Sequence, residues 1–333
     1  MPQLTLGDLT RSALFGHRNA TLKDSITTLS TEVTTGLTAR TTETVRGDYS
    51  ALTGIEASLT QLASFKLVTG ESAARAGHMQ LVLGNLADSG TALSNTLLAA
   101  ANSTSPTQVN VVAADADQRL QATLSALNTR FGATSLFAGD ATNRPAVADA
   151  DTMMTALQTA ITGALSAQDI TTAVDAWFAD PAGYQATVYQ GGDAQGGVDI
   201  SQDQRVQLGV TAKDPAITAT LKAMATAALL QRGVLAGDQV SRADLAKRAG
   251  QALARATAPL IELSARLGTT EATIANAGIR NDAETSALES ARLGLLSVDP
   301  YDAAARLQQA QTQLETLYSV TARLSRLSLV NYL

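Results

Sequence analysis

The sequence has 333 residues, no Cys, and a formal net charge of −6 from 24 basic and 30 acidic residues. The lack of Cys excludes disulfides, thiolate metal ligands and Cys nucleophiles, and the interspersed charges form no cationic patch for nucleic acid or anionic lipid. Aromatic residues and Pro are scarce, whereas Ala, Thr and Leu dominate. We therefore predict a mainly α fold: an elongated helical bundle or coiled coil formed by both chain ends, with a small β-containing inserted domain.

Residues 10–38 carry the first amphipathic pattern. Apolar side chains recur at three- and four-residue steps, which is the spacing of a coiled-coil seam. We predict a helix that ends near Gly36, followed by a polar loop over 38–44. The side chains assigned to an assembly interface here are Phe15, Leu22, Ile26, Leu29 and Val33.

A longer helical pattern begins near Asp48 and is long enough for a helix of about 50 residues. Four glycines interrupt it, and each costs about 1 kcal/mol relative to Ala in a helix. We expect close packing against a partner helix to explain them: Gly70, Gly77, Gly84 and Gly90. A turn over 102–107 separates this helix from a third, over 109–130.

The pattern changes between Phe131 and Lys213, where turn signals surround a short helical stretch over 153–165. Alternation over 184–190 indicates a strand, and the Gly-rich run 191–197 indicates a loose hairpin turn.

Two further strands, over 198–201 and 205–211, would complete a small antiparallel sheet. Trp177 and Phe178 are expected in the core of this insertion. The Gly-rich run lacks the Gly-Lys-Ser/Thr of a phosphate-binding loop, so we interpret it as a turn.

Helical periodicity returns after Pro215 and continues in a long stretch over 241–296, so we predict two or more helices in this region. After Asp299-Pro300 a strict alternation of three and four residues continues to the end of the sequence, so this helix is expected to seek a partner. Its assigned interface side chains are Leu307, Leu314, Leu317, Leu324, Leu327, Leu329 and Leu333.

The two heptad segments, one near each end of the sequence, could pair with one another. Neither has a large core of its own, so we expect each to become ordered only on assembly. The resulting division begins with an N-terminal helix over 1–40 and ends with a C-terminal helix over 299–333. Between them lie the two halves of a helical core domain, over 41–135 and 215–298, and a solvent-facing α+β insertion over 136–214.

Four local segments resemble one family, the flagellar hook-associated protein 3 group, which is related to flagellin. The first is Thr28–Gly36, the end of a helix at a Thr-Gly step. The second is Asn128–Val147, which contains Leu-Phe-Ala-Gly. The third is Tyr-Gln-Gly-Gly-Asp at 189–193, followed by Ile-Ser at 200–201. The fourth is 299–333, which ends in Leu-Ser-Leu-Val-Asn-Tyr-Leu. The segment Thr41–Asp48 departs from the family's usual Ser-x-Asp-Asp-Pro-like loop.

This resemblance implies a subunit of the second ring at the junction between hook and filament, situated between the first hook-associated protein and flagellin. It also implies export through the flagellar type III apparatus to the cell exterior, and a chaperone that guards the C-terminal helix before export. The first 20 residues agree, because they lack the apolar core and cleavage site of a secretory signal peptide. The sequence contains no run of 18 apolar residues, so we do not expect membrane insertion.

Two alternatives remain at this point: flagellin itself, and a helical ligand-binding sensor domain. We assign no catalytic, cofactor-binding or metal-binding residue. His17 and His78 are the only histidines and lack a metal-ligand spacing, and no Gly-x-Ser-x-Gly elbow is present. Polar groups of an active site do not cluster in the sequence, so we predict a protein that is not an enzyme.

Overall fold

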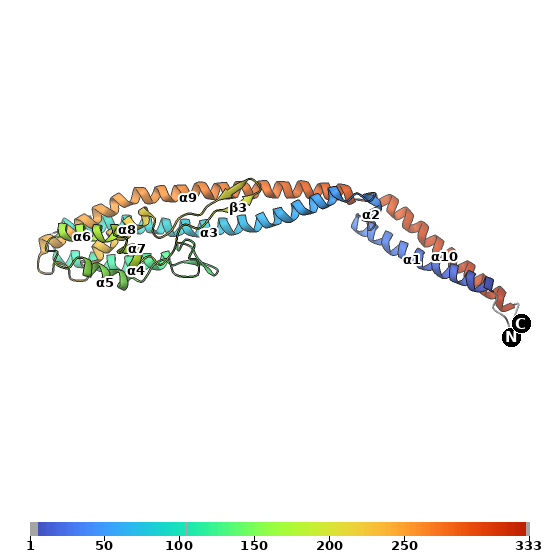
Figure 1. Ribbon diagram of the computed structural model, residues 1–333, viewed down its shortest axis with the longest axis horizontal. Helices are drawn as coiled ribbons and strands as arrows, with labels where there is room; N and C mark the ends of the chain where they lie inside the picture. The colour runs from blue at the N-terminus through green and yellow to red at the C-terminus, as the bar shows by residue number, and fades with distance from the viewer. Residues whose placement is uncertain (1–5, 104, 331–333) are drawn as a thin grey trace. The chain divides into compact units, whose positions relative to one another are not determined.

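The computed structural model describes the backbone of residues 6–103 and 105–330 and the side chains of Thr10, 13–103 and 105–324 (Figure 1). The chain divides into two compact units. Unit 1 contains the described residues up to Leu62 and those from Ala283 onward, whereas unit 2 contains Ala63–Asp282. Two long helices contribute to both units, α3 (Ser50–Ala101) and α9 (Gln239–Leu296). The predicted mainly α fold is confirmed.

Unit 1 is built around two helices, α1 (Leu6–Thr35) and α10 (Pro300–Val330), which pack lengthwise against each other (Figure 1). A single helical turn, α2 (Thr41–Thr44), follows α1. The first helix ends where the sequence predicts, because Gly36 adopts φ +69° and its N–H bonds the carbonyl of Glu32 at 2.8 Å. The predicted pairing of the two heptad segments is therefore present.

Unit 2 holds the main apolar core. Its principal layer is formed by α3, α9, α4 (Pro106–Leu127) and α8 (Pro215–Ala228), and three smaller helices cover it: α5 (Ala150–Ala160), α6 (Ala167–Ala179) and α7 (Tyr184–Thr187). Two antiparallel hairpins complete the unit: β1 (Arg130–Phe131) with β2 (Thr134–Ser135), and β3 (Val198–Ser201) with β4 (Gln204–Val206). Leu and Ala dominate this core, and Phe137 and Tyr184 are its largest aromatic side chains.

The region after Pro215 contains two helices, as the sequence predicts: α8, and α9, which is a continuous helix of 58 residues that contains Pro259. A proline removes one helical hydrogen bond and usually kinks or ends a helix. Here Leu260 and Leu263, directly after the proline, are both buried in the core. The burial of these side chains compensates for the missing bond and keeps the helix continuous.

Close packing does not explain most glycines of α3. A Cβ atom at Gly70 or Gly84 would meet nothing within 4 Å, and at Gly90 it would make ordinary contacts of 3.7 Å. The close approach occurs on the partner helix instead. A Cβ atom at Gly250 of α9 would lie only 3.0 Å from Leu98 Cγ, and the Ser94 hydroxyl donates to the Gly250 carbonyl at 2.7 Å.

The predicted strand over 184–190 is wrong. Tyr184–Thr187 form the helical turn α7, and only Tyr189 makes an isolated bridge, with Val147. The reason is that Tyr184 and Val188 are both buried, and a spacing of four residues places them on one face of a helical turn. The Gly-rich run is accordingly not a hairpin turn. The hairpin lies further along, between β3 and β4, and β4 ends at Val206 rather than at residue 211.

The hairpin of β3 and β4 is attached to α9. Ile200 and Val206 pack with Ile274 and Ala277 in a small separate cluster. The side-chain amide of Asn281 donates to the carbonyl of Ile200 at 2.8 Å. Burial of the apolar side chains and this bond fix the hairpin along the helix.

Tyr184 lies in an aromatic cluster of the insertion. Its ring stacks on Phe178 with centroids 5.2 Å apart, Phe178 meets Trp177 edge to face at 5.1 Å, and the Tyr184 hydroxyl donates to the carbonyl of Ala212 at 2.9 Å. Trp177 and Phe178 are half-buried and pack against the core, as the sequence predicts.

Burial raises the pKa of Tyr184 above its ordinary value of 10.0. The unfolded chain therefore loses this proton first, so the stabilisation is complete below pH 10 and decreases as the pH rises further. We expect Tyr184→Phe to flatten the loss of stability above about pH 10, where one such group contributes up to about 1.4 kcal/mol per pH unit. Urea unfolding followed by Trp177 fluorescence at several alkaline pH values measures this slope. Tyr301→Phe, at a side chain that is 89% exposed, should leave it unchanged.

Arg242 holds the turn that follows α8. Its buried guanidinium donates to the carbonyls of Val234 at 2.7 Å and Leu230 at 3.0 Å, and to the side-chain oxygen of Asn110 at 2.9 Å. Burial lowers the pKa of this group. All three acceptors are uncharged, so the arginine acts as a polar crosslink between α9, α4 and the turn.

We expect Arg242→Met to lower the free energy of unfolding by about 3 kcal/mol, because buried acceptors lose a charged donor. Arg266→Met is the matched control on the same helix. Its side chain is 60% exposed, and its ion pair among the described side chains is with Glu262, at 3.5 Å. A change within about 0.5 kcal/mol is expected there. Equal losses in the two variants, measured by chemical denaturation, would contradict the crosslinking role.

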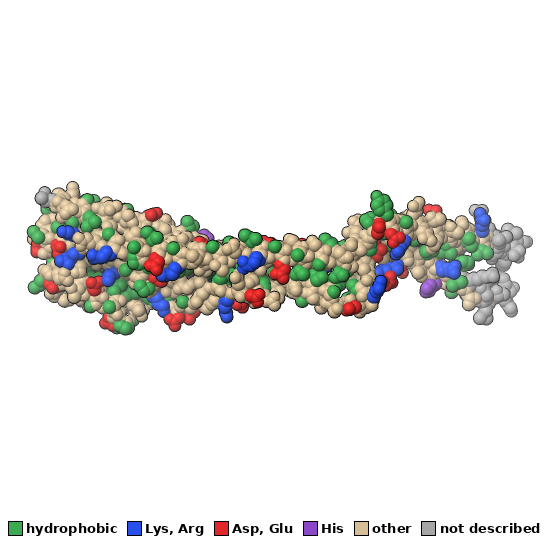
Figure 2. All heavy atoms as spheres, turned by 90° about the horizontal axis from the view of Figure 1, so that it is seen from above, with side chains coloured by type: hydrophobic (Ala, Val, Ile, Leu, Met, Phe, Trp, Pro, Cys, Tyr) green, Lys and Arg blue, Asp and Glu red, His purple; other side chains and the backbone are tan. Residues whose placement is uncertain are grey.

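Figure 2 shows basic and acidic side chains interspersed on the face that it presents, with no extended patch of one sign. Among the described helices, none combines the length and the apolar character needed to cross a bilayer.

Candidate assembly interface

The interface side chains predicted on α1 lie along its contact with α10. Phe15, Leu22, Ile26, Leu29 and Val33 are all half-buried. On α10, Leu307, Leu314 and Leu317 are half-buried too, whereas Leu324 is 40% exposed. The side chains of Leu327 and Leu329, and the whole of Leu333, lie outside the described residues. The structure thus brings the two predicted rows together without fully burying either.

Two small residues form the most buried part of the seam. Ala303 and Ala310 of α10 are 4% and 7% exposed, and they begin a row that continues at seven-residue steps through Leu317 to Leu324. Burial along this row decreases from Ala303 to Leu324. The helix pair is therefore tightest beside the loops that join it to α3 and α9, and it opens toward its other end.

An apolar groove marks the more open part of the pair. It has a volume of about 670 Å³ and is lined by Phe15 and Leu22 from α1 and by Leu317 and Val320 from α10. Because the two helices run antiparallel, residues from the first half of α1 lie beside residues from the second half of α10. His17, Arg18 and Thr312 add a polar rim.

Further apolar side chains of the pair face away from the seam. Among the described side chains, Leu14 is 54% exposed, Tyr301 89% and Tyr318 46%. The heptad pattern does not identify this second set, because heptads select only one stripe of each helix. A pair with apolar side chains on both sides has surface that further helices can cover.

The tight end of the pair is closed by backbone hydrogen bonds between two loops. Thr38 N–H donates to the carbonyl of Leu296 at 2.8 Å, and Val298 N–H donates to the carbonyl of Gly36 at 3.0 Å. The buried carboxylate of Glu32 accepts from the N–H of Ala39 at 3.0 Å and orders the same loop. Sequence periodicity does not predict the burial of Glu32, because glutamate is usually a surface residue.

Two segments that carried the family resemblance lie against each other in unit 2. Gly192 N–H donates to the carbonyl of Ala138 at 2.9 Å, and Asp140 N–H donates to the carbonyl of Asp193 at 2.8 Å. Gly139 between them adopts φ +62°. The Leu-Phe-Ala-Gly turn and the Tyr-Gln-Gly-Gly-Asp segment therefore form one paired loop.

Side chains secure this paired loop on both sides. Lys213 forms an ion pair with Asp193 at 2.6 Å, and this bond lowers the pKa of the carboxyl group. Asn128 bonds the backbone of Val147 twice, donating at 2.9 Å and accepting at 3.0 Å. Both motifs thus have a structural role within unit 2.

Within the described residues, no group of three or more His, Asp or Glu side chains is placed to hold a metal ion. His17 lines the apolar groove, and His78 is exposed, with its ring 5.5 Å from that of Phe131.

Comparison with known proteins supports the sequence resemblance. Residues 251–333 match a family model described as the bacterial flagellin C-terminal helical region. A search of curated proteins finds no match.

Two solved structures share the fold. One is from Vibrio parahaemolyticus and is described as a flagellar hook-associated protein; it aligns with a TM-score of 0.55 at 10% identity, over 74% of this chain and 98% of that one. The other is FlgL of Bacillus cereus, with a TM-score of 0.53 at 14% identity, over 72% of this chain and 100% of that one. The predicted resemblance is therefore confirmed at the level of the fold, and the family-model match supports it over residues 251–333.

Proposed function

We propose that this protein is a structural subunit of the bacterial flagellum that forms the junction between hook and filament, like hook-associated protein 3. The observation that carries the proposal is the α1–α10 pair, whose seam residues are half-buried and whose outer apolar side chains are exposed. Covering that surface needs further helices, and copies of the same chain supply them. The function is mechanical, and no chemistry is assigned.

In the assembly that we propose, α1 and α10 form an inner layer, the paired long helices form the next layer, and residues 136–214 face solvent. Heterologous interfaces allow one side of a ring to meet the first hook-associated protein and the other to meet flagellin. Export to the cell exterior through the flagellar type III apparatus, with a chaperone on the C-terminal helix, belongs to the same proposal.

A strain that lacks the gene tests this role. We expect hooks without attached filaments in electron micrographs, together with flagellin shed into the medium, and restoration of filaments by the wild-type gene. Attached filaments in the deletion strain would overturn the proposal. Loss of the filament with no flagellin in the medium would instead indicate that this chain is the filament subunit.

Limited proteolysis separates the assembly role from that of a helical ligand-binding sensor. Unit 2 has a large core, whereas among the described side chains of unit 1 the buried apolar ones are Leu52, Leu62, Ala303 and Ala310. We expect the purified monomer to lose α1 and α10 rapidly while unit 2 survives. Equal protection of all parts of the chain would favour a domain that acts as a monomer.

A further inference from the structure

Unit 2 contains a cavity that the proposed function does not use. It lies between α6, α8 and α9 and has a volume of about 480 Å³, within the range of small-molecule sites. The helices leave this space because small side chains occupy their facing positions: Ala219, Ala223, Ala249, Ala252 and Ala256.

The polar lining of this cavity is basic. Lys222, Arg248 and Arg255 line it, against a single acidic residue, Asp175. With Asp244, which pairs with Arg248 beside the lining, three cations meet two carboxylates, and one excess positive charge remains in a chain whose formal net charge is −6. A cavity with such a lining attracts anions, and its partly enclosed walls reduce screening by solvent.

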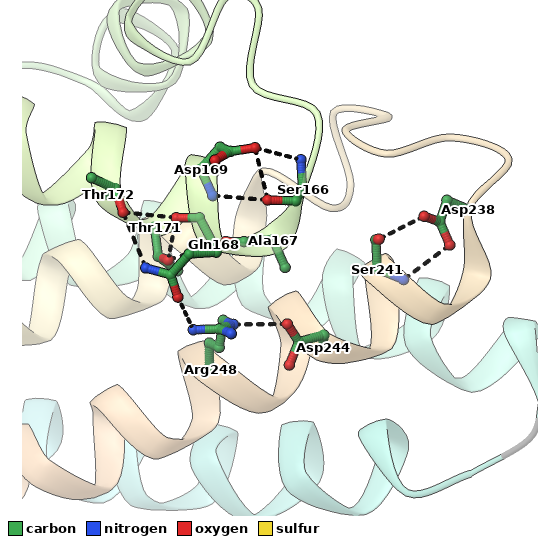
Figure 3. Close-up of polar contacts among 10 residues, drawn as sticks. All are labelled: Ser166, Ala167, Gln168, Asp169, Thr171, Thr172, Asp238, Ser241, Asp244 and Arg248. Atoms are coloured by element: carbon green, nitrogen blue, oxygen red, sulfur yellow. Dashed lines mark hydrogen bonds and ion pairs between the residues drawn. The ribbon is translucent and has the colours of Figure 1, made fainter.

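Two of the three cations are held in place by neighbours. Lys222 Nζ lies 2.6 Å from the Asp175 carboxylate. Figure 3 shows Arg248, which donates to Asp244 at 2.8 Å and to the side-chain oxygen of Gln168 at 2.5 Å. These contacts occupy only part of their donors, because an ammonium has three N–H groups and a guanidinium five. The remaining donors are thus available on side chains that have already lost much of their freedom.

The third cation, Arg255, is exposed and forms no ion pair among the described residues. It lies two helical turns beyond Arg248, on the same side of α9. Thr171, Thr226 and Gln251 add neutral hydrogen-bonding groups to the lining.

We propose that this cavity binds a small organic anion that carries two negative charges, through Lys222, Arg248 and Arg255. Either carboxylate or phosphate groups satisfy this chemistry, because both accept the planar fork of arginine and the point charge of lysine. The methylene body of the ligand would rest on the alanine floor.

Binding to the cavity is measured by isothermal titration calorimetry, as the heat exchanged on addition of the anion. Succinate and inorganic phosphate are titrated separately at constant ionic strength, balanced with chloride. We expect a saturable change with at least one of them. Arg255→Gln should weaken apparent affinity at least tenfold, and Arg255→Lys should retain most of it.

Lys247→Gln is the matched control, because this substitution removes the same charge from the same helix. Lys247 is exposed and does not line the cavity. Its affinity should stay within twofold of the wild type. The proposal is overturned if neither anion gives a saturable response, if Arg255→Gln binds like the wild type, or if both charge removals weaken binding equally. Succinate alone would identify a dicarboxylate site, and phosphate alone a phosphate site.

Discussion

Leu317→Asp is expected to abolish assembly while unit 2 stays folded. Leu317 lines the apolar groove together with Phe15 and Leu22, so a carboxylate there places a charge within the seam. Burying a Leu side chain contributes about 1.5–3 kcal/mol, and every subunit of an assembly would lose part of that contribution. Unit 2 has its own core and needs no contact from α10.

Complementation of the deletion strain measures this effect directly, with electron microscopy as the readout. Gln309→Asp is the control, since Gln309 is exposed on the same helix, lies outside the groove and undergoes the same change of charge. Unfolding of unit 2, followed by Trp177 fluorescence, should be equal in the two variants. If Leu317→Asp supported attached filaments, the seam would not be the assembly interface.

Gly139→Ala is expected to lower the free energy of unfolding of unit 2 by about 3 kcal/mol. A left-handed backbone conformation costs a residue with a Cβ atom about 1–2 kcal/mol, and steric overlap adds a similar amount. At Gly139, with φ +62°, the added Cβ atom would lie 2.9 Å from the carbonyl carbon of Asp193 and would overlap its oxygen. The paired loop would have to open.

Gly132→Ala measures the conformational part of this effect alone, so the difference between the two variants gives the steric part. Gly132 has nearly the same conformation, with φ +58°, but an added Cβ atom would meet nothing within 4 Å. We expect a loss of only about 1 kcal/mol there. Equal losses in the two variants, measured by denaturation, would show that the contact with Asp193 does not hold the loop.

Heptad periodicity predicted the helix pair because a repeating row of apolar side chains specifies both a helix and its contact face. The end of α1 at Gly36 and the start of α3 are also predictable from local sequence signals. Apolar periodicity does not predict α6, although Ser166 and Asp169 form a capping box at its start. Local chemistry alone is therefore sufficient to predict where this helix begins.

Other features depend on contacts between distant segments. The pairing of the two Gly-containing motifs brings Gly139 against Asp193, and no periodicity relates such positions. Pro259 stays within α9 because the residues after it are buried by other helices. The basic cavity likewise exists only where α6, α8 and α9 meet, so its three cations are separated along the chain.

The pairing of α1 with α10 also has a consequence for biosynthesis. Residues 36–299 separate the two helices, so a ribosome working at about 5–20 residues per second needs roughly 10–50 s to pass from one to the other. During that interval α1 has left the ribosome without its partner, whereas unit 2 can already begin to fold. Each newly made chain therefore carries the uncovered apolar stripe of the α1 segment for tens of seconds before its partner helix has been synthesised.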